Sequence, residues 1–287
     1  MKTFLSLALA ISISVATSDS IAQKAAAEPT SKVVLTSEVE WGALNPARGD
    51  KGPQAGNLWG DRAGSGASGF LVKFVGGFSS PPHIHNIAYR AVVISGLIYN
   101  GDPNAEVWWM PTGSFWTQPA GEAHITAAEG SNNLVYVEID EGPYLVFPTK
   151  KAFDSGERPV NVDASNIVWL DASNATLINQ PAIPATAKGP KIALLWGNPQ
   201  DDQLNGTLVK LPAEFTGKIR SRSSTFHAVV IQGRPNHRVQ GQTDIRSMEP
   251  GSYFSSKEEV AHQVSCEMTE DCIIYVRTKG KFEVIPG

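Results

Sequence analysis

Strong net charge, helical periodicity and a second long apolar run are all missing from this chain of 287 residues. Lys and Arg number 24 against 28 Asp and Glu, which gives a net charge of −4. This mild acidity provides no basic surface for nucleic acid and no polybasic patch for a membrane. Gly and Pro, at 26 and 19, are scattered along the chain, as in proteins with many short strands joined by turns. We therefore expect a β-rich protein whose partner is a small molecule.

Cysteine is also scarce, since Cys266 and Cys272 are the only two. Their spacing excludes a CxxC redox site, and they bracket residues 267–271, which we expect to be the tip of a hairpin. In an exported protein they would form a structural disulfide, which we favour over two free thiols. Because the closed loop is short, this link would stabilise the fold by less than about 3 kcal/mol.

The one extended apolar run lies at the start of the chain. Met1 and Lys2 precede FLSLALAISISVA, and Ser20-Ile21-Ala22 forms a small-x-small pattern before Gln23. The run is shorter than the roughly 20 residues needed to span a bilayer. It predicts a signal peptide over 1–22, cleaved near Ala22, with an uncleaved anchor as the alternative. The mature protein would be periplasmic or secreted, without membrane attachment, and would acquire any metal outside the cytoplasm.

Internal repeats decide the expected architecture. Short segments recur at an offset of 137 residues: KGP at 51–53 and 188–190, LWG at 58–60 and 195–197, and AVVISG at 91–96 as AVVIQG at 228–233. Upstream, Ser37 and Trp41 recur at an offset of 128, so the second copy has an insertion of nine residues, which we place in the loop around 175–187. The chain is thus predicted to hold two copies of one β unit, over 23–160 and 161–287, with the boundary in the segment 155–163.

The first copy concentrates histidines, of which the whole chain has six. His83 and His85 follow Pro81-Pro82 and stand at i and i+2, so in a strand both imidazoles would point to the same face. With the apolar run at 91–94 they are expected to form a hairpin. His124 precedes another apolar strand. Three imidazoles would hold a divalent metal with open positions; the alternative is three buried, hydrogen-bonded histidines without a metal.

The spacing of these residues resembles the two motifs of the cupin superfamily. The first motif is Gly77, His83, His85, Tyr89 and Gly96, and the second is Gly113, Pro119, Gly121 and His124. The resemblance implies an all-β protein of two tandem cupin barrels (double-stranded β-helix or jelly roll), with the metal in the first. The sequence departs from the family pattern at Tyr89, where cupins usually have a Glu ligand, and at Ala128, where they have Asn.

The same resemblance implies two classes of function. Several similar cupins with three-histidine sites are dioxygenases that cleave diketones or oxidise thiols. Others, the ChrR-like cupin domains fused to anti-sigma factors, hold zinc, and many two-barrel cupins are uncharacterised. We expect one divalent ion (Fe, Zn or Mn) and a dioxygenase acting on a small bidentate oxygen donor, because three neutral ligands leave the metal its full positive charge. The alternative is a non-catalytic module that binds or senses a metal or a small ligand.

Two further residues are candidates for catalytic roles beside the metal. The hydroxyl of Tyr89 would contact the substrate or a metal-bound water, or the ring would simply fill the barrel. Glu122 would act as a proton shuttle or support a ligand, or it would lie on the rim of the barrel. Four aromatic residues are expected to wall an apolar pocket or to belong partly to the core: Trp108, Trp109, Phe115 and Trp116.

The second copy is expected to be metal-free. The offset aligns His83 with Arg220 and His85 with Arg222, and guanidinium does not serve as a metal ligand. His262 alone is retained. Arg220, Arg222, His227 and His262 form either an anion site or a solvated face, of which we favour the face, and His237 receives no role. A homodimer formed through exposed sheet edges is also expected to be possible.

Overall fold

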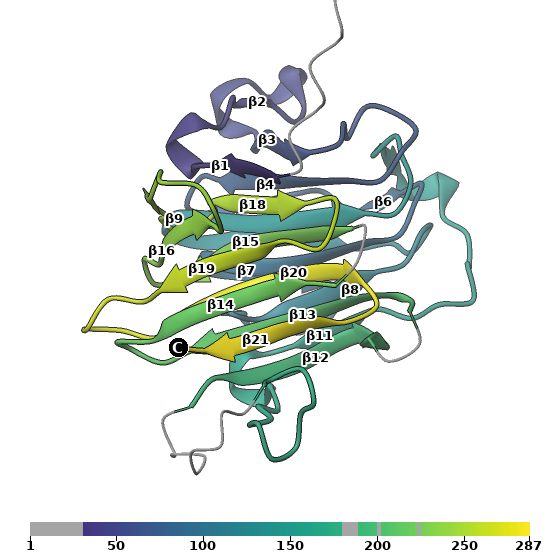
Figure 1. The fold of residues 1–287 in the computed structure, drawn as a ribbon. Helices are drawn as coiled ribbons and strands as arrows, with labels where there is room; N and C mark the ends of the chain where they lie inside the picture. The colour runs from purple at the N-terminus through teal and green to yellow at the C-terminus, as the bar shows by residue number, and fades with distance from the viewer. Residues whose placement is uncertain (1–30, 180–188, 200–201, 223–224) are drawn as a thin grey trace, which may run out of the picture.

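A computed structural model describes residues 31–179, 189–199, 202–222 and 225–287 of the chain (Figure 1). The expected leader at 1–22 lies outside them. Nearly all regular structure in these ranges is β, which confirms the all-β prediction, and none of their helices has the length and apolarity to cross a membrane. The helices are short 3₁₀ segments: η1 (Thr36–Glu38), η2 (Pro46–Lys51), which is kinked at Gly49, η3 (Thr149–Lys151) and η4 (Ala164–Asn166).

The first barrel is built around a sheet with the order β11-β8-β7-β9-β4-β3-β2, in which β5 also pairs with β9. Strands β7 and β9 are the longest of this sheet and pair along most of their length, while β6 and β10 form a separate two-stranded sheet. The bounds are β2 (Gly42–Ala43), β3 (Gln54–Trp59), β4 (Ser68–Phe74), β5 (Phe78–Ser79), β6 (His83–His85), β7 (Tyr89–Gly101), β8 (Phe115–Gln118), β9 (Ile125–Ile139), β10 (Val146–Pro148) and β11 (Val160–Val162).

The second barrel consists of two sheets, with the orders β1-β18-β15-β20-β13-β12 and β17-β16-β19-β14-β21. The bounds are β1 (Ser31–Val34), β12 (Lys191–Gly197), β13 (Leu204–Leu211), β14 (Thr216–Ser221), β15 (Phe226–Gln232), β16 (Asn236–Val239), β17 (Arg246–Ser247), β18 (Tyr253–Ser256), β19 (Ala261–Ser265), β20 (Cys272–Lys279) and β21 (Phe282–Pro286).

The two barrels pack sheet against sheet, and the repeated AVVI segments lie at this contact. In β7, Ala91 and Val93 point into the first barrel, while Val92 and Ile94 join a cluster shared between the barrels. The equivalent strand β15 alternates in the same way between its own core and the shared cluster. Because both faces of these strands are buried, their sequence is continuously apolar rather than alternating.

Each half of the chain contributes its first strand to the sheet of the other half. Strand β1 pairs with β18, with Val34 opposite Tyr253, and β11 pairs with β8, with Val162 opposite Phe115. Val34 and Val162 are separated by the offset of 128 found upstream in the repeat. The segment around 160, where the sequence places the domain boundary, is therefore a strand of the first barrel's sheet.

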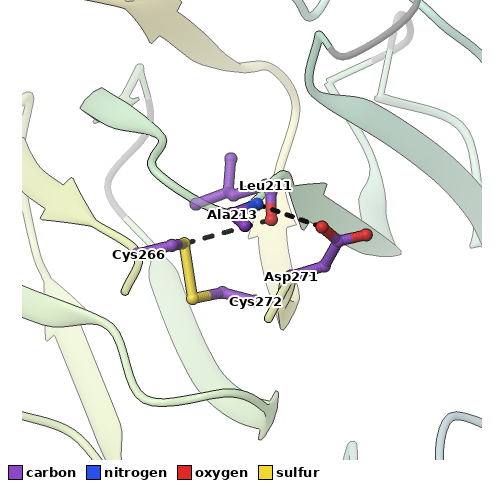
Figure 2. The surroundings of a disulfide bond; sticks show 5 residues. All are labelled: Leu211, Ala213, Cys266, Asp271 and Cys272. Atoms are coloured by element: carbon purple, nitrogen blue, oxygen red, sulfur yellow. Dashed lines mark hydrogen bonds between the residues drawn. A yellow bond between two sulfur atoms is a disulfide. The ribbon is translucent and has the colours of Figure 1, made fainter. Parts of the chain in front are cut away.

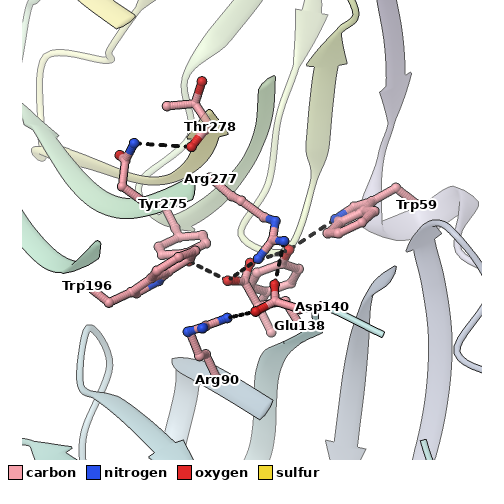
Figure 3. Close-up of polar contacts among 10 residues, drawn as sticks. Trp59, Arg90, Glu138, Asp140, Trp196, Tyr275, Arg277 and Thr278 are labelled. Atoms are coloured by element: carbon pink, nitrogen blue, oxygen red, sulfur yellow. Dashed lines mark hydrogen bonds and ion pairs between the residues drawn. The ribbon is translucent and has the colours of Figure 1, made fainter. Parts of the chain in front are cut away.

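A buried ion pair lies inside this contact (Figure 3). The carboxylate of Glu138 is fully buried and accepts bonds from Arg277 Nη1 at 3.1 Å and from the hydroxyls of Tyr136 and Tyr275 at 3.1 and 2.8 Å. The second amino group of Arg277 donates to Asp140 at 2.6 Å. Every oxygen of the Glu138 carboxylate thus has a donor, as a buried charge requires.

Aromatic rings extend the contact on either side of this pair. The indole of Trp59, from the first copy, stacks on the ring of His227 at 4.1 Å, and Trp196, from the second copy, stacks under the guanidinium of Arg90 at 3.9 Å. The indole nitrogens of Trp59 and Trp196 donate to the hydroxyls of Tyr136 and Tyr275. His227 therefore belongs to the interface between the barrels.

The disulfide joins Cys266 and Cys272, as Figure 2 shows. The hairpin predicted at this point is wrong, because β19 and β20 lie in different sheets and do not pair with each other. The bond closes the connection between the two sheets of the second barrel. The neighbouring Asp271 accepts a hydrogen bond from the backbone N–H of Ala213 at 3.0 Å.

Two buried histidines occupy the second barrel. His237 Nε2 and His262 Nδ1 are 3.0 Å apart, and His262 Nε2 contacts the hydroxyl of Ser256 at 3.2 Å. Burial lowers the pKa of His237 to about 4 and that of His262 to about 3. Both rings are therefore neutral at pH 7, and they serve as packed, hydrogen-bonded parts of the core.

We expect loss of the interfacial cation to destabilise the protein strongly. Arg277→Met leaves the Glu138 carboxylate buried without its partner, which costs about 3 to 5 kcal/mol of unfolding free energy. Urea unfolding measures this cost. The control is the double variant Glu138→Gln with Arg277→Met, which removes both charges and should recover much of the loss. A cost below about 1 kcal/mol for the single variant, typical of an exposed pair, would contradict this role.

The histidine pair should make stability depend on pH. An unfolded imidazole takes up its proton near pH 6.5, whereas the native rings stay neutral, so stability is lost as the pH falls below that value toward the native pKa. Between pH 7 and pH 5, we expect a His237→Leu/His262→Leu variant to lose about 4 kcal/mol less unfolding free energy than the wild type, about 2 kcal/mol for each histidine. Urea unfolding at both pH values checks this; equal losses would contradict it.

Candidate metal centre

Three histidines converge inside the first barrel. His83 and His85 lie on β6, and His124 immediately precedes β9. The backbones of His83 and His124 exchange two hydrogen bonds of 3.0 Å, and His85 accepts a bond from the N–H of Gly121 at 2.9 Å. One nitrogen from each ring lies within 4.8 Å of the corresponding nitrogens of the other two. The backbone pairing fixes the convergence that the motif spacing predicts.

The turn before His124 depends on glycine. Gly121 has a φ of +77°, and a Cβ there would lie 2.4 Å from the carbonyl oxygen of Phe153. Only glycine fits without moving the backbone. Since the N–H of Gly121 also binds the carbonyl of His85, the second motif's turn holds the strand of the first motif in place.

Each imidazole is oriented by a backbone carbonyl. The Nδ1 atom of His83 lies 2.9 Å from the oxygen of Pro81, that of His85 lies 3.2 Å from the oxygen of Leu145, and that of His124 lies 3.2 Å from the oxygen of Glu122. A carbonyl can only accept, so Nδ1 carries the proton in every ring and Nε2 presents its lone pair. This is the tautomer of a metal-binding histidine whose other nitrogen is held by a hydrogen bond.

The rings are also neutral at ordinary pH. Burial lowers the pKa of His124 to about 3 and that of His85 well below the usual value, and the neighbouring imidazoles lower both further. The pKa of the half-buried His83 is lowered mainly by burial, with a smaller contribution from the charge of Arg48. Imidazole binds metals in its neutral form, so no proton has to be displaced at pH 7.

A double proline places the first pair on the inner face. Ser79 pairs with Ala127, and His83 bridges to His124. Three residues, 80–82, therefore separate the paired positions on the first segment, whereas only two, 125–126, separate them on the opposite segment. The extra residue is a β-bulge at Pro81-Pro82. This extra residue turns His83 and His85 toward each other and toward His124.

The alignment of His83 with Arg220 and of His85 with Arg222 is therefore wrong by one residue. In the second barrel, β14 pairs without a bulge, and Ile219 lies opposite His262. Ile219 is fully buried, whereas Arg220 is half-exposed on the other face of the strand. Because side chains alternate along a strand, a shift of one residue exchanges the two faces.

The hairpin predicted for 83–96 is also wrong. Strand β6 pairs with β10, whereas β7 pairs with β8 and β9. The turn after His85 therefore connects two different sheets instead of two paired strands of one hairpin.

Tyr89 is buried behind the metal centre. Its hydroxyl donates to Asn100 Oδ1 at 3.0 Å and lies 3.4 Å from His124 Nε2. Burial raises the pKa of Tyr89, so the phenol keeps its proton. Asn100 Nδ2 donates to Gln118, whose amide nitrogen in turn contacts the carbonyl of Glu122. Tyr89 thus both packs in the barrel and belongs to a polar network that supports His124.

Glu122 contributes through its backbone, because its carbonyl binds the ring of His124. The residue lines a separate surface depression together with Asp154 and Arg158, and it is not among the residues of the histidine pocket. This position corresponds to the rim location that we considered for it from the sequence.

Tyr144 has a role at this site that we did not anticipate from the sequence. Its ring stacks on His85 with centroids 4.4 Å apart, and its hydroxyl lies 3.2 Å from His85 Nε2. Burial raises the pKa of Tyr144, so it too is a neutral phenol. The segment GPYLV, between two strands, was the available signal: an aromatic residue after Gly-Pro in a loop that returns to the barrel mouth.

A pocket of about 350 Å³ opens beside His83 and His85. Of the four aromatic residues expected to wall it, Trp116 does so, Phe115 lies in the cluster between the barrels, and Trp108 and Trp109 do not line it. Most of the remaining lining is apolar: Leu44, Pro46, Pro53, Val72, Phe74, Phe78, Pro81, Val135, Val137, Leu145 and Val146.

The residues of the second copy do not assemble into an anion site. Arg220 and Arg222 both pair with the carboxylate of Glu283, and Glu259 lies 3.8 to 4.0 Å from them. Their charges are therefore neutralised on a partly solvated face, as we favoured from the sequence, while His227 and His262 lie elsewhere.

The donor set of the first barrel suits a divalent transition metal. Three neutral imidazoles, with one ring nitrogen from each within 4.8 Å of the others, would form an open site in which further positions remain for water or a ligand. In the described part of the chain, these three residues are the one group of His, Cys, Asp or Glu with this convergence. A metal held there would supply a Lewis acid at the inner end of an apolar pocket.

Removing one ligand should release the metal. For His124→Ala we expect the metal content to fall at least about tenfold from one ion per chain, because even the loss of a supporting hydrogen bond costs ten- to a hundredfold in affinity. His262→Ala is the matched control, since it removes a buried histidine from the second barrel, and it should leave the content unchanged. Elemental analysis of purified protein measures both. Full retention in the His124 variant would contradict the site.

Solved structures with a similar fold include a protein of Nostoc punctiforme that is provisionally described as a dioxygenase. It is 14% identical over 88% of this chain and 83% of its own, with a TM-score of 0.64. An oxalate decarboxylase of Lactobacillus farciminis, in complex with formate, is 10% identical over 88% and 87%, with a TM-score of 0.56. A mutant oxalate decarboxylase of Bacillus subtilis is 13% identical over 87% and 77%, with a TM-score of 0.51. At these identities the likeness concerns the fold alone.

The neighbours are cupins, which confirms the all-β cupin fold expected from the sequence. No curated protein matches the chain. A family model described as a domain of unknown function, DUF4437, matches residues 32–285 and thus both barrels. The chain therefore belongs to the DUF4437 family, whose domain here takes the form of two packed cupin barrels.

Proposed function

We propose that this protein is an exported two-barrel cupin that binds one divalent metal through His83, His85 and His124 and acts as a dioxygenase on a small bidentate oxygen donor. The observation that carries this proposal is the clustering of three neutral imidazoles, each held at Nδ1 by a carbonyl, with one ring nitrogen from each within 4.8 Å of the others. The Nostoc punctiforme neighbour, provisionally described as a dioxygenase, supports the choice of reaction.

The charge of such a centre favours an anionic ligand. Three histidines leave a divalent ion with its full charge, and no Asp or Glu is among the residues lining the pocket. An enolate or a carboxylate would bind through two oxygens and neutralise this charge. With Fe(II), a remaining adjacent position would admit O₂.

The surrounding residues would orient and enclose this ligand. Tyr144 and Tyr89 place neutral hydroxyl groups beside the Nε2 atoms of His85 and His124, within reach of oxygens bound at the same point. The apolar wall around them, including Phe74 and Val137, excludes water from the ligand. The second barrel supports the first and takes no part in the chemistry.

A non-catalytic binding or sensing module, akin to the ChrR-like zinc-holding cupins, is the second candidate. The sequence pattern at 1–22 favours it indirectly, since a protein that is exported unfolded must acquire its metal outside the cytoplasm. There the affinity order of divalent ions favours zinc over Fe(II).

The experiment that separates the two combines metal analysis with turnover. Protein purified from its own compartment is analysed for metals, and oxygen uptake is then recorded with acetylacetone and related diketones, with oxalate added to the panel and formate as its readout. We expect iron and substrate-dependent oxygen uptake that disappears in His124→Ala.

The dioxygenase proposal would be overturned if the protein contains one zinc per chain, takes up no oxygen and remains inactive after reconstitution with Fe(II). This result would support the binding or sensing module. Uptake that persists in His124→Ala would show that the reaction occurs elsewhere.

A further inference from the structure

The pocket beside the histidines has an unbalanced charge. Among its lining residues, Arg48 is the one side chain with a full charge, and no carboxylate faces it. A divalent metal held by neutral histidines would add to this positive charge. In a pocket with mainly apolar walls such charges are screened poorly, so the pocket as a whole requires negative charge from its ligand.

Arg48 is placed at the pocket by a segment outside the barrel strands. It lies in η2, where Gly49 with a φ of +55° breaks the regular turn. Its guanidinium lies 5.7 Å from the ring centroid of Phe78, which also lines the pocket, and η2 packs beside β2 at the edge of the sheet. Within the described ranges the guanidinium makes no hydrogen bond or ion pair with another side chain, so its donors remain available for a ligand.

We propose that Arg48 is a specificity residue that binds a carboxylate of the substrate, so that the substrate is an organic acid with two separate oxygen-donor ends. One end, an enolate or a similar chelating group, would bind at the three histidines, and the other would bind the planar guanidinium through two parallel hydrogen bonds. The apolar wall between them fits a short hydrocarbon link. This inference rests on the proposed function of the histidine site and adds the class of substrate.

Two matched probes test the assignment on the zinc-loaded full-length protein, in which no turnover occurs. Acetylacetone and succinylacetone share the same diketone, but succinylacetone also has a carboxylate tail. Hexanoate, which has the carboxylate without the diketone, is the third probe. Binding of each is measured by isothermal titration calorimetry in the wild type, in Arg48→Gln, and in Lys51→Gln. The last is the control, because it removes the same charge from an exposed position of η2 that does not line the pocket.

We expect the wild type to bind succinylacetone at least about tenfold more tightly than acetylacetone, because hydrogen bonds between charged groups are stronger than those between neutral groups. Arg48→Gln should lose this advantage while its affinity for acetylacetone stays within about twofold, and Lys51→Gln should bind all probes like the wild type. Arg48→Lys keeps the charge and should recover part of the loss.

Equal binding of succinylacetone by the wild type and Arg48→Gln would overturn the role of Arg48 while leaving the metal-binding proposal intact. If neither diketone binds the wild type, the proposed chelation at the histidines fails instead. Hexanoate then decides the role of Arg48 on its own: weaker binding in Arg48→Gln supports it, and unchanged or absent binding overturns it.

Discussion

The burial of one sheet of each barrel against the other is the constraint on which this structure depends. Strands such as β7 and β15 contribute alternate side chains to their own barrel and to the shared cluster, so both faces of the sheet are removed from water. A single barrel with a polar site and an open pocket at its centre would have a reduced apolar core. Here the shared cluster supplies additional burial, which allows the first barrel to keep a cavity and several polar groups inside.

The shared face also distinguishes the two copies from each other. Glu138 lies opposite Gly69 on β4, and Arg277 lies opposite Gly206 on β13, so the two charged residues occupy equivalent positions of the repeat. Two identical copies would bring like charges together at this buried point, whereas the two different copies form an ion pair. The exchange of β1 and β11 between the sheets adds a second link. The same barrel has consequently taken two forms, one with a metal-ready centre and one with a closed core that includes Ile219 and a pair of neutral histidines.

Much of this could be predicted from the sequence, because it depends on local spacing. The offset of the repeats predicts two barrels, and the i, i+2 pair of His83 and His85 together with His124 predicts their convergence. The sequence-based predictions fail where the position of a residue depends on strand register or on contacts between distant segments. The bulge at Pro81-Pro82 shifts one strand by a residue, so that a constant offset assigns Arg220 to the wrong face. Tyr144 and Arg48 reach the pocket from segments whose placement is set by tertiary contacts. The aromatic residue after Gly-Pro is the one local signal for Tyr144, and no local pattern marks Arg48.

The proposed metal centre depends on one arrangement: three neutral imidazoles that would present Nε2 to a common metal. X-ray absorption spectroscopy at the zinc edge of the reconstituted protein tests it most directly. We expect three imidazole nitrogens at about 2.0 to 2.1 Å from the zinc, with the outer-ring scattering of histidine and no sulfur. A first shell with one imidazole or none, made up of oxygen or sulfur, would contradict it.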